Sequence, residues 1–358
     1  MRQKNPVLFD RNENRYGPAP GCLDVLRTAE PELLYNYTRA FQQGSYSDLS
    51  RRLAEVHGVA ERRIILGYGC EDILKGVVHH FLGAGETILI PSASWWYYNA
   101  IADEVGGVTV QYPLVEQEHR YVLDVDRLIA LREEHDPGLV LIASPNNPTG
   151  NVLPRDELLR VLEAYADVPV VLDQAYFGLT AGHEADEIAH LTESFPHLLV
   201  LRTFSKLYAL AGVRIGYGIT GYRLDGFRQF CLRNLGYNRL SERIALAALD
   251  DPGYYREVAR HMESDRQAFY RFFRSYEGCR IFESAANFVL VKFPPGVAPV
   301  LKEALDRRGL IVKFFTEPAF VGYARISLGT TAENAILRDE IREAWPAAAL
   351  GAAGSGVA

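Results

Sequence analysis

The stretch Leu198–Lys206 reads Leu-Leu-Val-Leu-Arg-Thr-Phe-Ser-Lys, an apolar run that ends in hydroxyl-bearing and basic residues. Two other stretches repeat this arrangement: Leu139–Ala143 is followed by Ser144-Pro-Asn-Asn-Pro-Thr-Gly150, and Val170-Val-Leu leads into Asp173-Gln-Ala-Tyr176. Near-continuous runs of Val, Ile and Leu are typical of strands covered on both faces. Because ligands bind beyond the carboxyl ends of parallel strands, these polar residues predict a site at one edge of a sheet.

Further strands of the same character extend this pattern along the chain. The candidates are Ile64–Leu66, Thr87–Ile90, Val108–Tyr112, Leu139–Ala143, Val168–Leu172, Leu198–Leu201 and Ile215–Ile219. Helical patterns lie between them, for example Leu49, Leu53 and Val56 on one face. Alternation of strand and helix predicts the α/β class: a large domain with a mostly parallel seven-stranded sheet flanked by helices.

The pattern of apolar residues changes after about residue 245. An apolar helical stripe there includes Phe269 and Phe273, and Asn287–Phe293 and Ala324–Leu328 have the character of strands. We therefore expect a smaller α+β domain beside the large one. The predicted division is 31–245 for the large cofactor-binding domain, 1–30 with 246–346 for the small domain, and a disordered Ala/Gly-rich tail over 347–358.

Composition excludes several classes of protein. The 358 residues are 48% hydrophobic and 23% charged, as expected for a globular protein that buries a substantial core. A net charge of −7 argues against general nucleic-acid binding. The four cysteines lie far apart with no CxxC pair, so we expect neither a metal site nor a disulfide framework. The sequence shows no apolar membrane span or signal core, and we expect a cytoplasmic protein.

The chemistry of the polar segments matches the needs of pyridoxal phosphate. The aldehyde of this cofactor needs an amine for a Schiff base, which Lys206 can supply once its pKa is lowered. The ring nitrogen must stay protonated, and a buried carboxylate such as Asp173 favours that state. Tyr176 and Asn147 can donate to the phenolic oxygen.

The phosphate of the cofactor needs a guanidinium, hydroxyl groups and a helix N-terminus. Arg214, in Ala211-Gly-Val-Arg-Ile-Gly-Tyr217, and the hydroxyls of Thr203 and Ser205 fit the first two needs. The glycine-rich turn Gly67-Tyr-Gly-Cys-Glu71, between a strand and a helix, fits the third.

Taken together, these segments resemble the fold type I pyridoxal-phosphate enzymes of the class I/II aminotransferases, most of all the histidinol-phosphate aminotransferase branch. The order Asn-Pro-Thr-Gly, Asp-x-x-Tyr, Ser-Lys and then Arg214 carries the resemblance. It extends from Asn12-Glu-Asn-Arg-Tyr-Gly-Pro18 to Ala324-Arg-Ile-Ser-Leu-Gly-Thr330. The resemblance implies a homodimer with active sites at the subunit interface and small amino-acid or oxo-acid substrates.

The resemblance also implies roles for particular residues. Lys206 would bind the cofactor covalently and move the proton, Asp173 would pair with the ring nitrogen, and Tyr176 and Asn147 would contact the phenolic oxygen. Arg325 would grip an anionic group of the substrate. The groups expected to hold the phosphate are Gly69, Cys70 and Glu71 through backbone N–H groups, with Thr203, Ser205 and Arg214.

Two aromatic positions leave alternatives open. In Leu34-Tyr-Asn-Tyr37, Tyr37 is preferred over Tyr35 as the tyrosine that reaches the phosphate of the other subunit. In Pro91-Ser-Ala-Ser-Trp-Trp-Tyr-Tyr98, Trp95 is the candidate for stacking on the cofactor ring; the alternative is core packing at a helix start.

Some positions depart from the histidinol-phosphate pattern. Gln174 stands where an acid is usual, Arg15 beside Tyr16 stands where proline is common, and Lys313 stands where relatives that bind a phosphorylated substrate carry arginine. A lysine offers a point charge rather than a bidentate fork. We therefore expect Arg15, Tyr16, Asn147, Lys313 and Arg325 to contact a substrate other than histidinol phosphate.

Three functions are compatible with these residues. The leading hypothesis is an aminotransferase of a specialised biosynthetic pathway, moving an amino group between an amino acid or amine and a 2-oxo acid. A decarboxylase, or an eliminating, cyclising or oxidising enzyme, would need nearly the same residues. A binding or regulatory protein that has lost catalysis is the third, and the intact set of Lys206, Asp173, Tyr176 and Arg214 argues against it.

Overall fold

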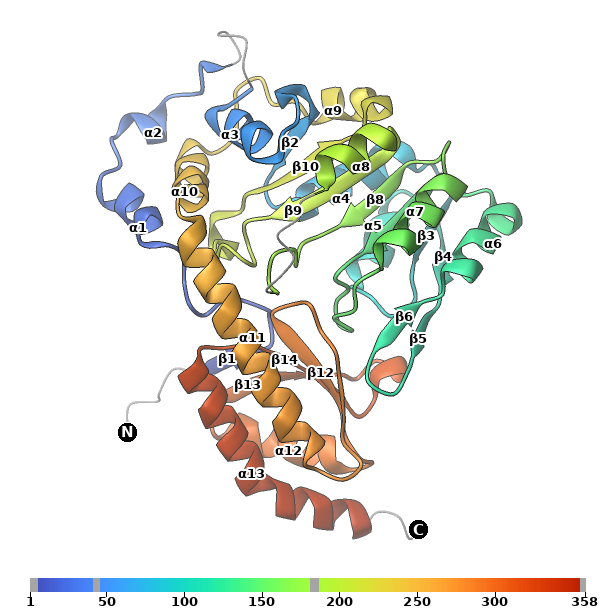
Figure 1. Ribbon diagram of the computed structural model, residues 1–358, viewed down its shortest axis with the longest axis vertical. Helices are drawn as coiled ribbons and strands as arrows, with labels where there is room; N and C mark the ends of the chain where they lie inside the picture. The colour runs from blue at the N-terminus through green and yellow to red at the C-terminus, as the bar shows by residue number, and fades with distance from the viewer. Residues whose placement is uncertain (1–5, 41–45, 181–186, 355–358) are drawn as a thin grey trace.

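Two sheets organise the chain, one in the upper and one in the lower part of Figure 1. The computed structural model describes residues 6–40, 46–180 and 187–354. The larger sheet has the strand order β2-β10-β9-β8-β7-β3-β4. Its strands are β2 (Ile64–Gly67), β3 (Thr87–Pro91), β4 (Val108–Tyr112), β7 (Leu139–Ala143), β8 (Val170–Asp173), β9 (Leu198–Thr203) and β10 (Gly216–Thr220).

All seven expected strands therefore lie in one sheet. The pairs β9-β8-β7-β3-β4 are parallel, and β10 is antiparallel to both β9 and β2. Alternate residues of β7 enter two different cores: Val140 and Ile142 belong to one, Leu139 and Leu141 to the other. Burial of both faces explains why the strand is apolar without interruption.

Helices cover both faces of the larger sheet (Figure 1). Those that precede, connect or follow its strands are α3 (Asp48–His57), α4 (Cys70–Phe81), α5 (Tyr97–Glu104), α6 (Val125–His135), α7 (Arg155–Ala164), α8 (Ile188–Ser194) and α9 (Asp225–Cys231). In α4, Ile73, Leu74, Val77 and Val78 are buried, which is the spacing of one helical face.

The smaller sheet has the order β1-β13-β14-β12-β11. Its strands are β1 (Val7–Phe9), β11 (Arg280–Phe282), β12 (Phe288–Lys292), β13 (Leu310–Phe314) and β14 (Tyr323–Ser327). The expected strands at 287–293 and 324–328 correspond to β12 and β14. The structure confirms the predicted fold class, a mostly parallel seven-stranded sheet with helices plus a smaller α+β part.

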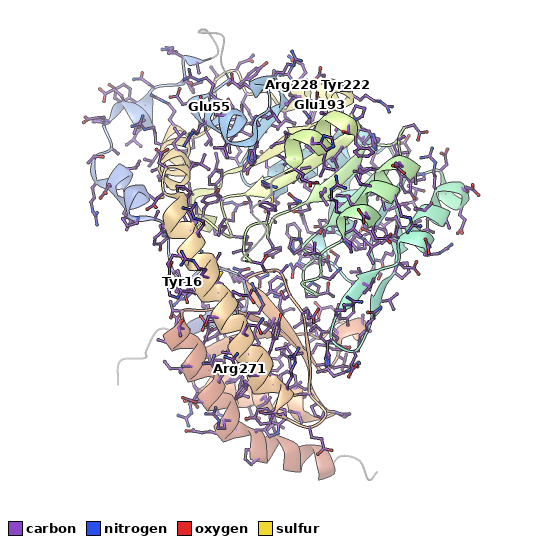
Figure 2. All side chains as sticks on the ribbon, viewed as in Figure 1. Tyr16, Glu55, Glu193, Tyr222, Arg228 and Arg271 are labelled. Carbon is purple, nitrogen blue, oxygen red and sulfur yellow. The ribbon has the colours of Figure 1, made fainter. Side chains whose placement is uncertain are left out.

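Three helices pack with the smaller sheet: α11 (Pro252–Arg274), α12 (Val297–Arg307) and α13 (Thr331–Gly354). The predicted aromatic stripe lies on α11, where Phe269 and Phe273 are fully buried. Side chains fill the space between these helices and the sheet (Figure 2).

The N-terminal segment contributes to both parts of the fold. Strand β1 pairs in parallel with β13 of the smaller sheet. Helix α1 (Pro20–Arg27), followed by α2 (Glu32–Tyr35), instead packs against α10 (Arg239–Leu249), and its Cys22 joins the core of the larger sheet. The division of the chain at residues 30 and 245 stays a prediction.

The C-terminal segment differs from the sequence-based expectation. A disordered tail is predicted from residue 347, whereas α13 continues through Gly354; residues 355–358 lie outside the described residues. Alanine has the highest helix propensity, which favours continuation of the helix through this Ala-rich stretch. No helix in the described ranges is long and apolar enough to cross a membrane. The cytoplasmic setting stays a prediction.

A hairpin fastens the two sheets to each other. It consists of β5 (Leu114–Glu116) and β6 (Tyr121–Leu123), and Glu116 at its end lies against the smaller sheet. The Glu116 carboxylate accepts hydrogen bonds from Tyr323 and from Lys292, whose Nζ lies 3.1 Å from Oε1. It also pairs with Arg280, so β11, β12 and β14 are all tied to the hairpin.

We predict that Glu116→Ala lowers the free energy of unfolding by about 1–3 kcal/mol, because it leaves partly buried donors without an acceptor. Burial alone would raise the pKa of Glu116, but hydrogen bonds from Tyr323 and Lys292 outweigh it and lower the pKa. The stabilisation is therefore present above pH 4.5, the group's ordinary value, and lost as the pH falls through the lower folded value.

Thermal unfolding measured at several pH values checks this prediction. Glu118→Ala is the matched control, since that side chain is 84% exposed on the same hairpin. Equal melting temperatures for the Glu116→Ala and Glu118→Ala proteins at neutral pH would contradict the proposed fastening.

Candidate active site

Strand ends converge at one edge of the larger sheet. The last residue of β7, Ala143, is paired with Asp173 at the end of β8, and Asp173 is paired with Leu201 on β9. Gly216, the first residue of β10, is paired with Thr203 on β9 and Gly67 on β2. The segments that follow or precede these residues therefore meet, as the strand-edge argument predicts.

Lys206 follows β9 and points to the N-terminal segment. Its Nζ lies 3.2 Å from the backbone oxygen of Asn12 and 3.3 Å from that of Arg11. Burial, aided by the positive charge of Arg325, lowers the pKa of Lys206 to about 8. About half of the amine is thus neutral near pH 8, and a neutral amine is the nucleophile that attacks an aldehyde.

Asp173 is buried, with only 6% of its surface exposed. The hydroxyl of Tyr98 donates to its Oδ2 at 2.9 Å, and the backbone N–H of Ala175 donates to Oδ1 at 2.9 Å. Burial raises the pKa of Asp173, while these two hydrogen bonds act in the opposite direction. A buried carboxylate held in this way can pair with a protonated ring nitrogen.

Tyr176 lies beside Lys206, whose Nζ is 5.6 Å from the centre of its ring. The Asn12 side-chain amide donates to the Tyr176 hydroxyl at 2.9 Å. Burial raises the pKa of Tyr176 to about 12, so the phenol stays protonated and can donate to an oxyanion.

Arg325 reaches the same edge from β14 of the smaller sheet. Its guanidinium donates to the Asn147 side-chain oxygen and to the backbone oxygen of Asp10. Its buried Nε has no hydrogen-bond partner among the described residues. Both acceptors are uncharged, so no acidic group is hydrogen-bonded to this buried cation.

An anion cradle lies where β2 leads into α4. Helix α4 begins at Cys70 with Gly69 as N-cap (φ 85°), and no side chain caps its first turn. A Cβ atom added to Gly69 would lie 2.7 Å from Arg214 Nη2, and one added to Gly216 would lie 2.4 Å from the Cys70 backbone nitrogen. These glycines let the guanidinium and the helix N-terminus approach each other closely.

The remaining candidate phosphate ligands border this cradle. The backbone N–H of Ser205 donates to the Thr203 hydroxyl at 3.1 Å, and the two hydroxyls lie 3.0 Å apart. Glu71 uses its carboxylate to bind Arg214, at 3.3 Å from Nη2. The pKa of the Cys70 thiol is raised by burial, which keeps it neutral.

Trp95 precedes α5 and packs edge-on against Tyr98, with ring centres 5.7 Å apart. It therefore lies next to the tyrosine that binds Asp173. Its stacking on a cofactor ring stays a prediction.

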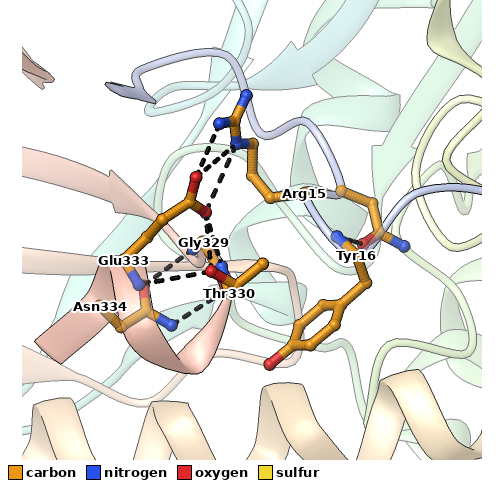
Figure 3. A network of polar contacts seen from close by, with 7 residues as sticks. Arg15, Tyr16, Gly329, Thr330, Glu333 and Asn334 are labelled. Atoms are coloured by element: carbon orange, nitrogen blue, oxygen red, sulfur yellow. Dashed lines mark hydrogen bonds and ion pairs between the residues drawn. The ribbon is translucent and has the colours of Figure 1, made fainter. Parts of the chain in front are cut away.

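The other candidate substrate ligands are paired elsewhere. Arg15 Nη2 lies 2.7 Å from Glu333 Oε1 in the first turn of α13, where Glu333 also accepts from Thr330 (Figure 3). The Tyr16 hydroxyl lies 3.0 Å from Oδ2 of Asp265, which belongs to α11. Figure 2 shows Tyr16 beside this helix. These contacts give no support to a substrate role for Arg15 or Tyr16, which stays a prediction.

The last candidates are Lys313, at the rim of the site, and Tyr37 with its alternative Tyr35, which lie outside the site of their own chain. Lys313 on β13 is the cross-strand neighbour of Arg325. Tyr37 is 62% exposed and Tyr35 is 66% exposed, with the Tyr35 hydroxyl donating to Glu32. Within the described part of a single chain, neither tyrosine is hydrogen-bonded to the site.

Two residues that contact the site were not predicted for it. Asn12 has a positive φ of 54° and binds Tyr176, Lys206 and Ser327. Tyr98, a buried residue in the first turn of α5, binds Asp173; the available signal was the aromatic cluster before and at the start of this helix, to which it belongs. In the described ranges, no group of three or more His, Cys, Asp or Glu side chains could hold a metal ion.

The donor set fits pyridoxal phosphate. A lysine with a lowered pKa, a buried acid, a protonated phenol and an open helix N-terminus beside an arginine meet the needs of its aldehyde, ring nitrogen, phenolic oxygen and phosphate. The fold and these residues define a pyridoxal-phosphate enzyme.

Comparison with known proteins gives the family. The sequence profile described as aminotransferase class I and II matches residues 4–341. The chain belongs to this family and is a pyridoxal-phosphate-dependent aminotransferase. It is 30% identical over 347 residues to a histidinol-phosphate aminotransferase of Ruminiclostridium cellulolyticum, covering 95% of this chain and 93% of the relative.

Solved structures agree with this assignment. A histidinol-phosphate aminotransferase of Sinorhizobium meliloti in complex with pyridoxal-5′-phosphate has a TM-score of 0.85 and 26% identity, covering 96% of this chain and 91% of that one. An L-threonine-O-3-phosphate decarboxylase of Porphyromonas gingivalis has a TM-score of 0.78 at 20% identity, covering 94% and 98%. The second likeness concerns the fold alone.

The lowered pKa of Lys206 predicts the pH dependence of cofactor capture. When apoprotein is mixed with pyridoxal phosphate, the rate of covalent attachment should rise with pH and level off above about pH 8, where the amine is neutral. Because the charge of Arg325 contributes to the low pKa, Arg325→Gln should move the midpoint upward. Stopped-flow absorbance measures the rate, and exposed Arg308→Gln is the control. A midpoint near pH 10.5, the ordinary lysine value, would contradict the burial of Lys206.

Proposed function

We propose that this aminotransferase transfers the amino group of an amino acid or amine other than histidinol phosphate to a 2-oxo acid, in a specialised biosynthetic pathway. The observation that carries the proposal is the buried Arg325 guanidinium, which has neutral acceptors and one unpartnered N–H. Such a group would bind the α-carboxylate of the donor as a charge-assisted pair.

Bound pyridoxal phosphate supplies an electron sink for the negative charge that develops at the donor's α-carbon. Lys206, displaced by the incoming amine, would take the α-proton and return it on the cofactor side. Asp173, kept in place by Tyr98, would hold the ring nitrogen protonated. Asn147 would connect the Arg325 clamp to the cofactor's phenolic side, since the two side chains are hydrogen-bonded.

The proposal of a substrate other than histidinol phosphate depends on Lys313, at the rim of the site. Lys313 lies opposite Arg325 across β13 and β14. The family resemblance implies an arginine at this position in relatives that bind a phosphorylated substrate. A lysine cannot form the bidentate contact that an arginine makes with a phosphate, so affinity for a phosphate ester should be lower.

We further propose a homodimer in which Tyr37 of one chain contacts the cofactor phosphate of the other. The exposure of Tyr37 and of neighbouring Leu34, at 62% and 76%, is consistent with a surface that a partner covers. The Tyr35 hydroxyl is engaged by Glu32, which favours Tyr37 of the two.

A panel of amino donors tests the reaction type. Addition of the correct donor to holoenzyme should abolish the visible band of the covalently bound cofactor and yield one equivalent of the corresponding oxo compound, which is a 2-oxo acid when the donor is an amino acid. The band should return when a 2-oxo acid acceptor is added. Histidinol phosphate should react at least about tenfold more slowly than the best donor, which corresponds to about 1.4 kcal/mol. Release of carbon dioxide in place of a 2-oxo acid would establish the decarboxylase alternative.

Mixed dimers test the shared site. Lys206→Ala and Tyr37→Ala proteins should each be impaired, whereas dimers re-formed from an equal mixture should recover up to about a quarter of the wild-type activity. The reason is that a mixed dimer contains one site with both an intact lysine and an intact tyrosine. Tyr35→Ala is the control. A mixture of the Tyr35→Ala and Lys206→Ala proteins should show no more activity than the Tyr35→Ala protein contributes alone. A monomer in sedimentation, fully loaded with cofactor, would exclude the shared site.

A further inference from the structure

The rim of the site beyond Arg325 contains a carboxylate that neutralises a cation. Lys313 and Arg325 are paired across antiparallel strands, so their side chains leave the same face of the smaller sheet. Glu317 follows β13, and its Oε1 lies 3.5 Å from Lys313 Nζ. Lys313 could otherwise bind a second negative group of a substrate next to Arg325, but it already has Glu317 as its counter-ion.

Glu317 is held in this position by the backbone. The N–H of Thr316 donates to Glu317 Oε2 at 2.9 Å. Burial alone would raise the pKa of Glu317, but backbone hydrogen bonds and Lys313 outweigh it and lower the pKa. The side chain is thus ionised at neutral pH. Burial lowers the pKa of the Arg325 guanidinium, and the charge of Glu317 opposes that lowering, as Tyr176 and Asp10 also do.

Two arginines of the N-terminal segment are also matched by acids. Arg15 pairs with Glu333 at 2.7 Å, and Arg11 lies 3.8 Å from Asp10. Arg325 differs, because its acceptors are an amide oxygen and a backbone oxygen. Arg325 is thus a buried cation without an acidic hydrogen-bond partner, and its cross-strand neighbour Lys313 is paired with the ionised Glu317.

We propose that Glu317 is a specificity-determining residue that repels substrates with a second negative group. The amino donor is then an α-amino acid with one carboxylate and no negative charge on its side chain, rather than a dicarboxylate or a phosphate ester. Arg325 binds the carboxylate, and any further anion that reaches toward Lys313 meets the Glu317 charge at short range. This inference rests on the proposed function, since it assigns the donor of the same site.

Equilibrium binding tests the inference without turnover. Glutarate and valerate have the same chain length and differ in one carboxylate, and their dissociation constants can be measured from changes in the cofactor absorbance of holoenzyme. Wild-type protein should prefer valerate. Glu317→Gln should shift the ratio of the two constants about three- to tenfold toward glutarate, as expected for one partly exposed charge.

Two further variants sharpen the test. Lys313→Met should shift the ratio in the opposite direction, because Glu317 then lacks its counter-ion. Glu303→Gln, an exposed substitution on α12, is the control for the loss of one acidic charge and should leave the ratio within twofold of wild type. A ratio that Glu317→Gln leaves unchanged, or a wild-type preference for glutarate, would overturn the inference.

Turnover separates this inference from the proposed function. L-Norvaline and L-glutamate form the matching pair of amino donors, and Glu317→Gln should raise the kcat/KM of glutamate relative to norvaline by a similar factor. If no donor in a broad panel yields a 2-oxo acid, the proposed function fails, while the binding ratios still decide the role of Glu317. If donors react and the ratio does not move, only the role of Glu317 fails.

Discussion

A short bent segment, Asp10–Asn12, holds together the two charges on which the site depends. Its backbone oxygens accept hydrogen bonds from Lys206 of the larger sheet and Arg325 of the smaller one. The Asn12 side chain adds contacts with Tyr176 and Ser327. Because the segment follows β1, which is paired with β13, the smaller sheet is joined through its own first strand to the amine of Lys206.

This arrangement explains how two like charges can be buried together. Each positive group obtains dipolar acceptors rather than a carboxylate, so neither is neutralised by the protein. Burial of the two cations costs free energy. Burial is also the main cause of the lowered pKa values of Lys206 and Arg325. A site with this residual positive potential attracts a cofactor phosphate and a substrate carboxylate, although the chain as a whole has a charge of −7.

The sequence was sufficient to predict those features that depend on strand periodicity and chain order. The seven strands of the larger sheet could be found because both faces are buried, and Asp173 and Lys206 could be grouped because parallel strand ends meet at one edge. Contacts such as Tyr98 with Asp173 or Asn12 with Tyr176 join residues 75 and 164 positions apart. Their partners depend on side-chain direction in the folded chain, which periodicity does not give.

The central claim is that Lys206 is the residue that binds the cofactor. Borohydride reduction of holoenzyme followed by peptide mass spectrometry tests it most directly, since reduction makes the linkage permanent and the chain has five other lysines against which the site can be distinguished: Lys4, Lys75, Lys292, Lys302 and Lys313. The account predicts one pyridoxyl phosphate group per chain, on the peptide that contains Lys206. Stoichiometric modification of any other lysine, with Lys206 unmodified, would contradict it.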